Sequence, residues 1–151
     1  MQRSGLTVLA GALLCVPAAL AANGGHQQSV DVVTRIMDPL KDYWVSLRND
    51  GDSDWIYFIT LSRARCVLSE VRYSVNSDAL DQVFEPYACD LARPYSLPNT
   101  VLPEDIAVHY DDGALETVSV QATFTDGTKS EVLTYRPCDD AGLTTCAVRV
   151  Q

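Results

Sequence analysis

Hydrophobic and polar residues alternate along the second half of the chain with the period of a β-strand. The pattern is clearest at Val118, Val120, Ala122 and Phe124, which are separated by polar residues. Such alternation predicts a strand with one face on a core and the other toward solvent. Similar segments are centred on Tyr73, on Val108 and on residues 132–135. These four segments are predicted to be strands.

Two Asp-Gly pairs separate the last three of these segments. Asp112-Gly113 follows the segment around Val108, and Asp126-Gly127 follows the segment that begins at Val118. Glycine readily adopts the positive φ angle that tight hairpin turns require, and Asp-Gly is a frequent hairpin pair. The three segments between residues 106 and 135 are therefore predicted to be consecutive antiparallel strands of one meander.

Aromatic and β-branched residues are concentrated nearer the N-terminus. Residues 43–47 and 55–61 have this composition, and the turn-forming run 49–54 separates them, so a hairpin or two neighbouring strands are predicted. Residues 30–36 fit a strand by composition and a helix by spacing. Residues 84–103 contain four prolines and are predicted to be mainly loop.

This succession of short strands without a long helix predicts an all-β fold. An immunoglobulin-like antiparallel β-sandwich is expected, with a small barrel as the alternative. The expected organisation is a leader at residues 1–21, an unstructured terminus of the mature chain at 22–28, and a single domain at 29–151.

The N-terminus has the pattern of a secretory signal peptide. Arg3 precedes an apolar stretch at residues 6–20, and residues 19–21 form an Ala-x-Ala site that predicts cleavage before Ala22. Pro17 interrupts a stretch that is shorter than the ~20 residues of a membrane-spanning helix. We therefore expect a periplasmic or secreted protein without membrane insertion.

Four cysteines follow the leader, and an even number in an exported domain predicts two disulfides. They are Cys66, Cys89, Cys138 and Cys146. Of the three pairings, Cys66–Cys89 and Cys138–Cys146 are preferred because each closes a loop between neighbouring elements. No metal site is predicted from cysteine and histidine, since no Cys-x-x-Cys pair exists and the two histidines are His26 and His109.

Charge restricts the class of partner. The chain has 20 acidic and 11 basic residues, a formal charge of −9, which becomes −10 when the leader is removed with Arg3. A negative field repels phosphate backbones and anionic lipids, so a nucleic-acid or membrane-surface partner is not expected. A basic partner is favoured, although acidity also keeps exported proteins soluble.

No residue is assigned a catalytic or cofactor-binding role. His109 is the one histidine outside the terminus, and no Gly-x-Ser-x-Gly turn accompanies it. The acidic run at residues 50–54 departs from the EF-hand, because Trp55 and Leu61 stand where glycine and glutamate are required. A solvated turn is expected there, with a calcium site of another kind as the alternative. The acidic pair at residues 111–112 is expected to be a turn former.

Aromatic residues near the predicted first hairpin are the candidate binding residues. They are Tyr43, Trp44, Trp55 and Tyr57. Aromatic side chains on neighbouring strands usually fill the core, whereas a ligand platform would leave at least two rings exposed on one face.

Two blocks of sequence resemble prokaryotic YEATS-like domains. Residues 55–61 and 67–75 are similar to the family's Trp-containing strand, short link and Val-x-Tyr-x-Leu strand. Residues 118–127 are similar to its penultimate strand and Asp-Gly turn, so the resemblance covers about residues 55–135. It implies a sandwich fold and a binding role without an identified ligand.

These observations predict an exported, non-enzymatic binding module that recognises a protein or another macromolecule. One alternative is a periplasmic inhibitor or immunity-type protein that blocks an exported hydrolase. Another is a small secreted hydrolase.

Overall fold

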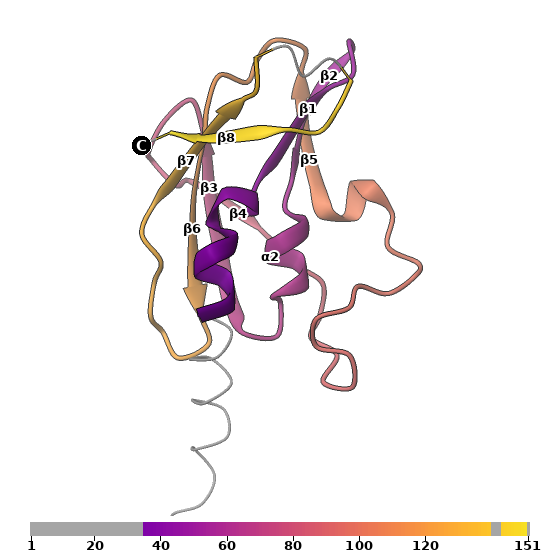
Figure 1. Ribbon diagram of the computed structural model, residues 1–151, viewed down its shortest axis with the longest axis vertical. Helices are drawn as coiled ribbons and strands as arrows, with labels where there is room; N and C mark the ends of the chain where they lie inside the picture. Colours follow the sequence, from indigo (N-terminus) through magenta and orange to yellow (C-terminus); the bar gives the residue numbers. More distant parts are fainter. Residues whose placement is uncertain (1–34, 140–142, 151) are drawn as a thin grey trace, which may run out of the picture.

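The computed structural model describes residues 35–139 and 143–150. Its strands form two antiparallel sheets (Figure 1). One sheet has the order β1-β2-β5, and the other has the order β4-β3-β6-β7-β8. The expected fold class, an antiparallel β-sandwich with two disulfides, is confirmed. The leader, residues 22–28 and most of the ambiguous segment 30–36 lie outside the described residues.

The three-stranded sheet consists of β1 (Ser46–Asn49), β2 (Ser53–Tyr57) and β5 (Ala107–Asp111). The five-stranded sheet consists of β4 (Gln82–Phe84), β3 (Leu68–Val75), β6 (Val118–Phe124), β7 (Leu133–Pro137) and β8 (Ala147–Val150). Within the described part of the chain, the sheets are accompanied by the short helices η1 (Asp38–Tyr43), α2 (Ile59–Arg63) and η2 (Pro103–Ile106).

The predicted first hairpin is confirmed in β1 and β2, but both segments are shorter than the composition predicted. Strand pairing runs from Ser46 opposite Tyr57 to Asn49 opposite Asp54. Residues 59–61 belong to α2 and not to a strand, because the backbone turns after Phe58 and the amide of Ser62 bonds to the Phe58 carbonyl at 2.8 Å. Tyr43 likewise ends η1.

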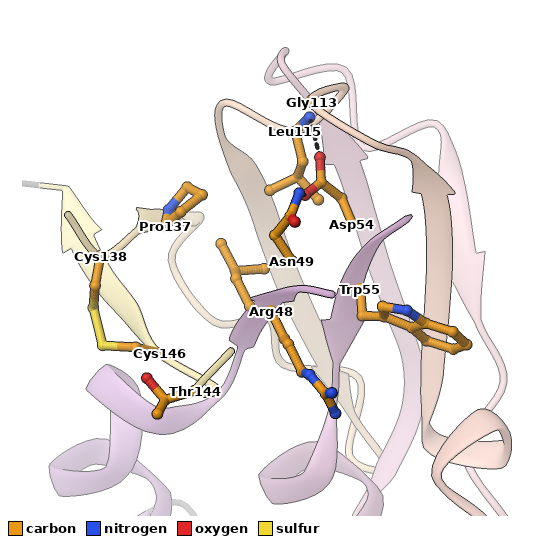
Figure 2. Close-up of a pocket in the computed structure, with 11 residues that line it drawn as sticks. Arg48, Asn49, Asp54, Trp55, Gly113, Leu115, Pro137, Cys138, Thr144 and Cys146 are labelled. Carbon is orange, nitrogen blue, oxygen red and sulfur yellow. Dashed lines mark hydrogen bonds between the residues drawn. A yellow bond between two sulfur atoms is a disulfide. The ribbon is translucent and has the colours of Figure 1, made fainter. Parts of the chain in front are cut away.

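The predicted meander is wrong at its first turn. Strand β5 pairs with β2 in the three-stranded sheet, and β6 lies in the other sheet between β3 and β7. Gly113 has the expected positive φ of 73°, yet the chain then crosses between the sheets. The buried Asp54 carboxylate accepts a 3.1 Å hydrogen bond from the Leu115 amide and so anchors this crossing to β2 (Figure 2).

Asn76 anchors the same crossing to β3. Its side-chain amide donates to the Ala114 carbonyl at 2.8 Å, and its side-chain oxygen accepts from the amides of Glu116 and Thr117 at 2.9 and 3.0 Å. The segment after β5 is therefore held by side chains that are remote from it in the sequence. The Asp112-Gly113 pair alone does not predict these contacts.

The second Asp-Gly turn connects β6 and β7 as predicted. Gly127 has a φ of 86°, and its amide donates to the Phe124 carbonyl at 2.9 Å. Strand β8, which the sequence pattern did not predict, pairs with β7 from Thr134 opposite Val150 to Pro137 opposite Ala147. The Cys138–Cys146 disulfide joins the ends of these two strands.

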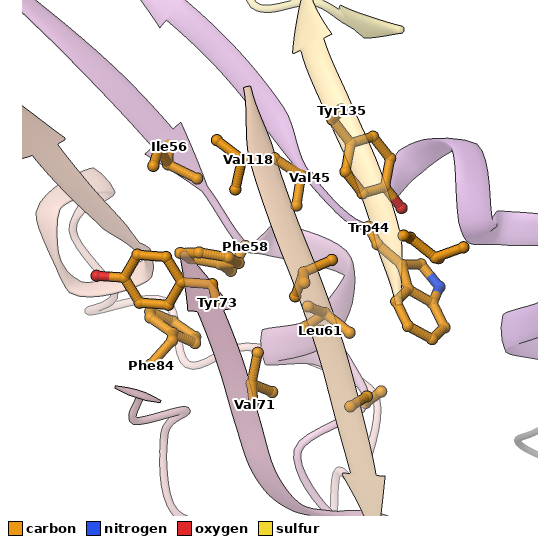
Figure 3. Close-up of a cluster of buried hydrophobic side chains, with 14 of the residues drawn as sticks. Trp44, Val45, Ile56, Phe58, Leu61, Val71, Tyr73, Phe84, Val118 and Tyr135 are labelled. Atoms are coloured by element: carbon orange, nitrogen blue, oxygen red, sulfur yellow. The ribbon is translucent and has the colours of Figure 1, made fainter. Parts of the chain in front are cut away.

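The core lies between the sheets and includes large aromatic side chains (Figure 3). Trp44 is 1% exposed, and its indole nitrogen donates to the Met37 carbonyl at 3.2 Å. Phe58 is fully buried and packs on Phe84, with ring centroids 4.4 Å apart. Such packing closes the interior, so the polar and partly exposed groups of the outer faces are the ones available for contact with other molecules.

Residues 85–102 form a loop, as the prolines predicted. The disulfide between Cys66 and Cys89 attaches this loop to the end of the α2 region. Among the described residues, no helix has the length and apolar character needed to cross a membrane.

Candidate functional site

The outer face of the three-stranded sheet carries an unusual row of side chains. Cross-strand register places Arg48, Trp55 and His109 side by side on β1, β2 and β5, with Tyr57 two residues further along β2. Successive side chains of a strand alternate between faces, and Ile56 is fully buried, so this row points away from the core. We call Arg48, Trp55, Tyr57 and His109 the aromatic face.

Trp55 contacts both of the other rings of the aromatic face. The ring centroids of Trp55 and Tyr57 are 6.2 Å apart, with planes inclined by 21°. His109 lies beside Trp55 on the neighbouring strand β5, with ring centroids 5.0 Å apart and planes inclined by 35°. Trp55 and Tyr57 are only partly exposed, because each ring covers part of its neighbour, whereas His109 is exposed. The result is a nearly continuous ring surface.

Asp50 fixes the orientation of Trp55. The indole nitrogen donates to one Asp50 carboxylate oxygen at 2.9 Å, and the other oxygen accepts from the backbone amides of Asp52 and Ser53 at 3.1 and 2.9 Å. These amides and the indole lower the pKa of Asp50, so the carboxylate stays ionised and holds the ring. The run at residues 50–54 thus forms a self-bonded turn.

The four candidate aromatic residues lie at different places. Trp55 and Tyr57 share the outer face, so two rings do lie together there. Trp44 is a core residue, and Tyr43 is 66% exposed on η1. The sequence pattern did not separate these roles, because it could not show that β2 begins at Ser53 and directs Trp55 outward.

Arg48 is the member of the site that sequence reasoning missed. Its Nε atom is buried without a hydrogen-bond partner, and its guanidinium forms no ion pair within the described residues. The alternation of Ser46, Leu47 and Arg48 was the available signal, since it predicts that Arg48 is on the face opposite Leu47.

Two carboxylates of the same hairpin, Asp50 and Asp54, are engaged with other groups. Asp54 accepts hydrogen bonds from the Asn49 side-chain amide at 2.7 Å and from the Leu115 amide at 3.1 Å. Figure 2 shows the Arg48 side chain extending away from Asp54. Arg48 acts on Asp50 only through space, as a minor contribution to the lowered pKa of Asp50.

Two cavities meet at Arg48. One, of about 350 Å³, lies between the β1–β2 hairpin and the Cys138–Cys146 disulfide (Figure 2). The other, of about 540 Å³, extends from Arg48 past Ser46 and Tyr57 and is bounded by Thr145 and by an apolar wall. That wall consists of Ile59, Val101, Leu102, Pro103 and Ile106. We call the second cavity the Arg48 groove.

Among residues 35–139 and 143–150, no group of three or more histidine, cysteine or acidic side chains is placed to hold a metal ion. His109 contacts the Trp55 ring. The geometry of the site is suited to contact and recognition through aromatic surface, one cation and an apolar wall.

Comparison of the chain with protein-family models, with curated proteins and with solved structures finds no match. The arguments about function below therefore start from the geometry of the site.

Proposed function

We propose that the protein is an exported binding module that recognises a protein partner through the aromatic face. The observation that supports this proposal is the pair of contacting rings, Trp55 and Tyr57, on the outer surface of the sheet. The core already contains the aromatic side chains of Trp44 and Phe58, which are almost completely buried. Trp55 and Tyr57 are not part of this core. Tryptophan and tyrosine are enriched at the centres of protein interfaces.

The charges around the aromatic face favour a basic partner. Asp50 and Asp52 lie in the turn beside Trp55, and Asp111 lies opposite Ser53 on the neighbouring strand. With a formal charge of −9 for the chain, these carboxylates would attract a basic surface and orient it toward the rings. An inhibitor of a basic exported hydrolase is one form of this function.

The YEATS-like relationship is part of the same proposal. The blocks that carry the resemblance include parts of β2 and α2 together with β3 and β6, and these three strands belong to the sandwich here. A binding role without chemistry is also the role that the resemblance implies.

Affinity capture tests the proposal. The exported form of the chain would be immobilised and exposed to envelope extract, and bound proteins would be identified by mass spectrometry. The Trp55→Ala/Tyr57→Ala variant should lose the partner that the wild type retains. Tyr43→Ala is the matched control, because Tyr43 is exposed but lies on η1. Retention of the same partner by the double variant would contradict the proposed site.

Association kinetics test the electrostatic part. The association rate should fall as salt shortens the screening length from ~10 Å at 0.1 M to ~3 Å at 1 M. His109→Ala removes one ring of the aromatic face, so it should raise the dissociation rate and change the association rate much less. A turnover activity that His109→Ala abolishes would show instead that the protein is an enzyme.

A further inference from the structure

Arg48 is partly buried and makes no ion pair or side-chain hydrogen bond, whereas the other described basic residues without such a partner, Arg35, Arg63 and Lys129, are exposed. Among the described residues, five basic side chains form ion pairs, and Arg65 donates three hydrogen bonds to backbone carbonyls. The chain has 20 acidic residues, so carboxylates are plentiful. Arg48 is partly buried and has its Nε atom fully enclosed, yet it contacts none of them. A buried, unpaired donor is costly and calls for an explanation. Arg65 also has one such nitrogen, but its other nitrogens donate to backbone carbonyls, whereas the Arg48 guanidinium has no partner at all among the described residues.

The Arg48 groove offers this guanidinium a surrounding that is polar on one side and apolar on the other. Ser46, Tyr57 and Thr145 line the groove beside Arg48, and none of their side-chain hydroxyls makes a hydrogen bond within the described residues. The facing wall is aliphatic and includes Leu102, which is 53% exposed. Its volume of about 540 Å³ is within the range of small-ligand sites.

We infer that the Arg48 groove binds a carboxylate group carried on an apolar chain. The guanidinium fork matches the two oxygens of a carboxylate, the free hydroxyls add further hydrogen bonds, and the aliphatic wall takes the attached chain. This inference rests on the proposed function, because it names the chemical group that a partner presents beside the aromatic face.

A carboxylate suits this groove better than a phosphate does. A phosphate monoester carries up to two negative charges and is normally held by several cations or backbone amides. The groove contains one cation, and the chain around it is strongly acidic. A carboxylate ligand is compatible with a basic partner. The net charge of the partner acts over the screening length, whereas Arg48 selects a single carboxylate group in direct contact.

The test uses two probes of equal shape, hexanoate and its uncharged amide, hexanamide. Binding would be followed by two-dimensional NMR on the exported form of the chain, with the Trp55 indole signal as reporter, since Trp55 lies opposite Arg48 in the strand register. Hexanoate should bind more tightly than hexanamide. Arg48→Gln should weaken hexanoate binding about tenfold or more and leave hexanamide binding nearly unchanged, because it removes a charge-assisted hydrogen bond.

Two variants control for charge and geometry. Arg48→Lys keeps the charge but loses the fork, so an intermediate loss is expected. Arg63→Gln removes an exposed arginine on α2 that does not line the groove, and it should have no effect. Equal binding of both probes, the same hexanoate affinity in wild type and Arg48→Gln, or no binding of hexanoate would each overturn the inference. The proposed function is tested separately, by capture of a partner with the wild type and with the Trp55→Ala/Tyr57→Ala variant. The outcome of that capture does not depend on whether hexanoate binds.

Discussion

Arg65 donates a hydrogen bond from Nε to the backbone carbonyl of Ala88 at 3.0 Å, and each of these residues is next to one cysteine of the Cys66–Cys89 disulfide. The Arg65 guanidinium is almost completely buried and also donates to the carbonyls of Arg93 and Ser96. The disulfide and the arginine therefore hold the loop at residues 85–102 together, one covalently and the other through carbonyl groups.

We expect Arg65→Leu to destabilise the protein by about 2–3 kcal/mol, because three carbonyls lose their charged donor. Urea unfolding would measure the change, and limited proteolysis should show faster cleavage within residues 85–102. Arg63→Leu is the matched control, since Arg63 is exposed two residues away and should have little effect. Equal stability of Arg65→Leu and wild type would show that the loop is held by the disulfide alone.

Arg48→Met is expected to preserve or raise stability, by up to about 1 kcal/mol. The substitution keeps a long side chain and removes a buried Nε that has no hydrogen-bond partner. A residue whose removal stabilises the fold while it weakens ligand binding is typical of functional sites. Thermal and urea unfolding of the variant would measure this, and a loss of more than about 1 kcal/mol would show that Arg48 is needed for the fold.

The two disulfides should contribute unequally to stability. They close loops with sequence separations of 23 and 8 residues. The chain-entropy relation then predicts losses of about 3.4 kcal/mol for Cys66→Ala/Cys89→Ala and about 2.5 kcal/mol for Cys138→Ala/Cys146→Ala. Denaturant unfolding of both double variants would test the order. A larger loss from the second pair would mean that β8 depends on its disulfide for more than loop closure.

The protein should lose stability in alkaline solution. Burial is the largest cause of the raised pKa values of Tyr73 and Tyr135. When the pKa of a tyrosine is higher in the folded than in the unfolded state, its contribution to the free energy of unfolding is fully present below the unfolded pKa of about 10. This contribution is lost as the pH rises from there toward the folded pKa. Urea unfolding between about pH 8 and 11 would show the decline. Tyr135→Phe should make it shallower, and a pH-independent free energy of unfolding would contradict the prediction.

Calcium and chelators should leave the melting temperature unchanged. The carboxylate of Asp50 already accepts three hydrogen bonds from its own turn and from Trp55, so recruiting it for a cation would break these bonds. Scanning calorimetry with calcium and with excess chelator would compare the two conditions. A rise of several degrees with calcium would indicate a site in the turn, because a ligand of the folded state stabilises it.

Local features of the sequence were sufficient for a large part of this fold. The alternation from Val118 to Phe124 predicted β6, because side chains of a strand alternate between core and solvent. The Asp126-Gly127 turn was predicted because glycine adopts a positive φ without strain. Both disulfides were predicted from compartment and loop length.

Relations between distant residues were decided only by the tertiary structure. The Asp112-Gly113 pair has the same local chemistry as Asp126-Gly127, yet β5 pairs with β2, because Asp54 and Asn76 hold the segment that follows. The site shows the same limit. Composition identified the aromatic residues. Which strands pair, and where their side chains lie, decides that Trp55 points outward and that no carboxylate of the described residues lies beside Arg48. A local sequence pattern does not predict such pairing.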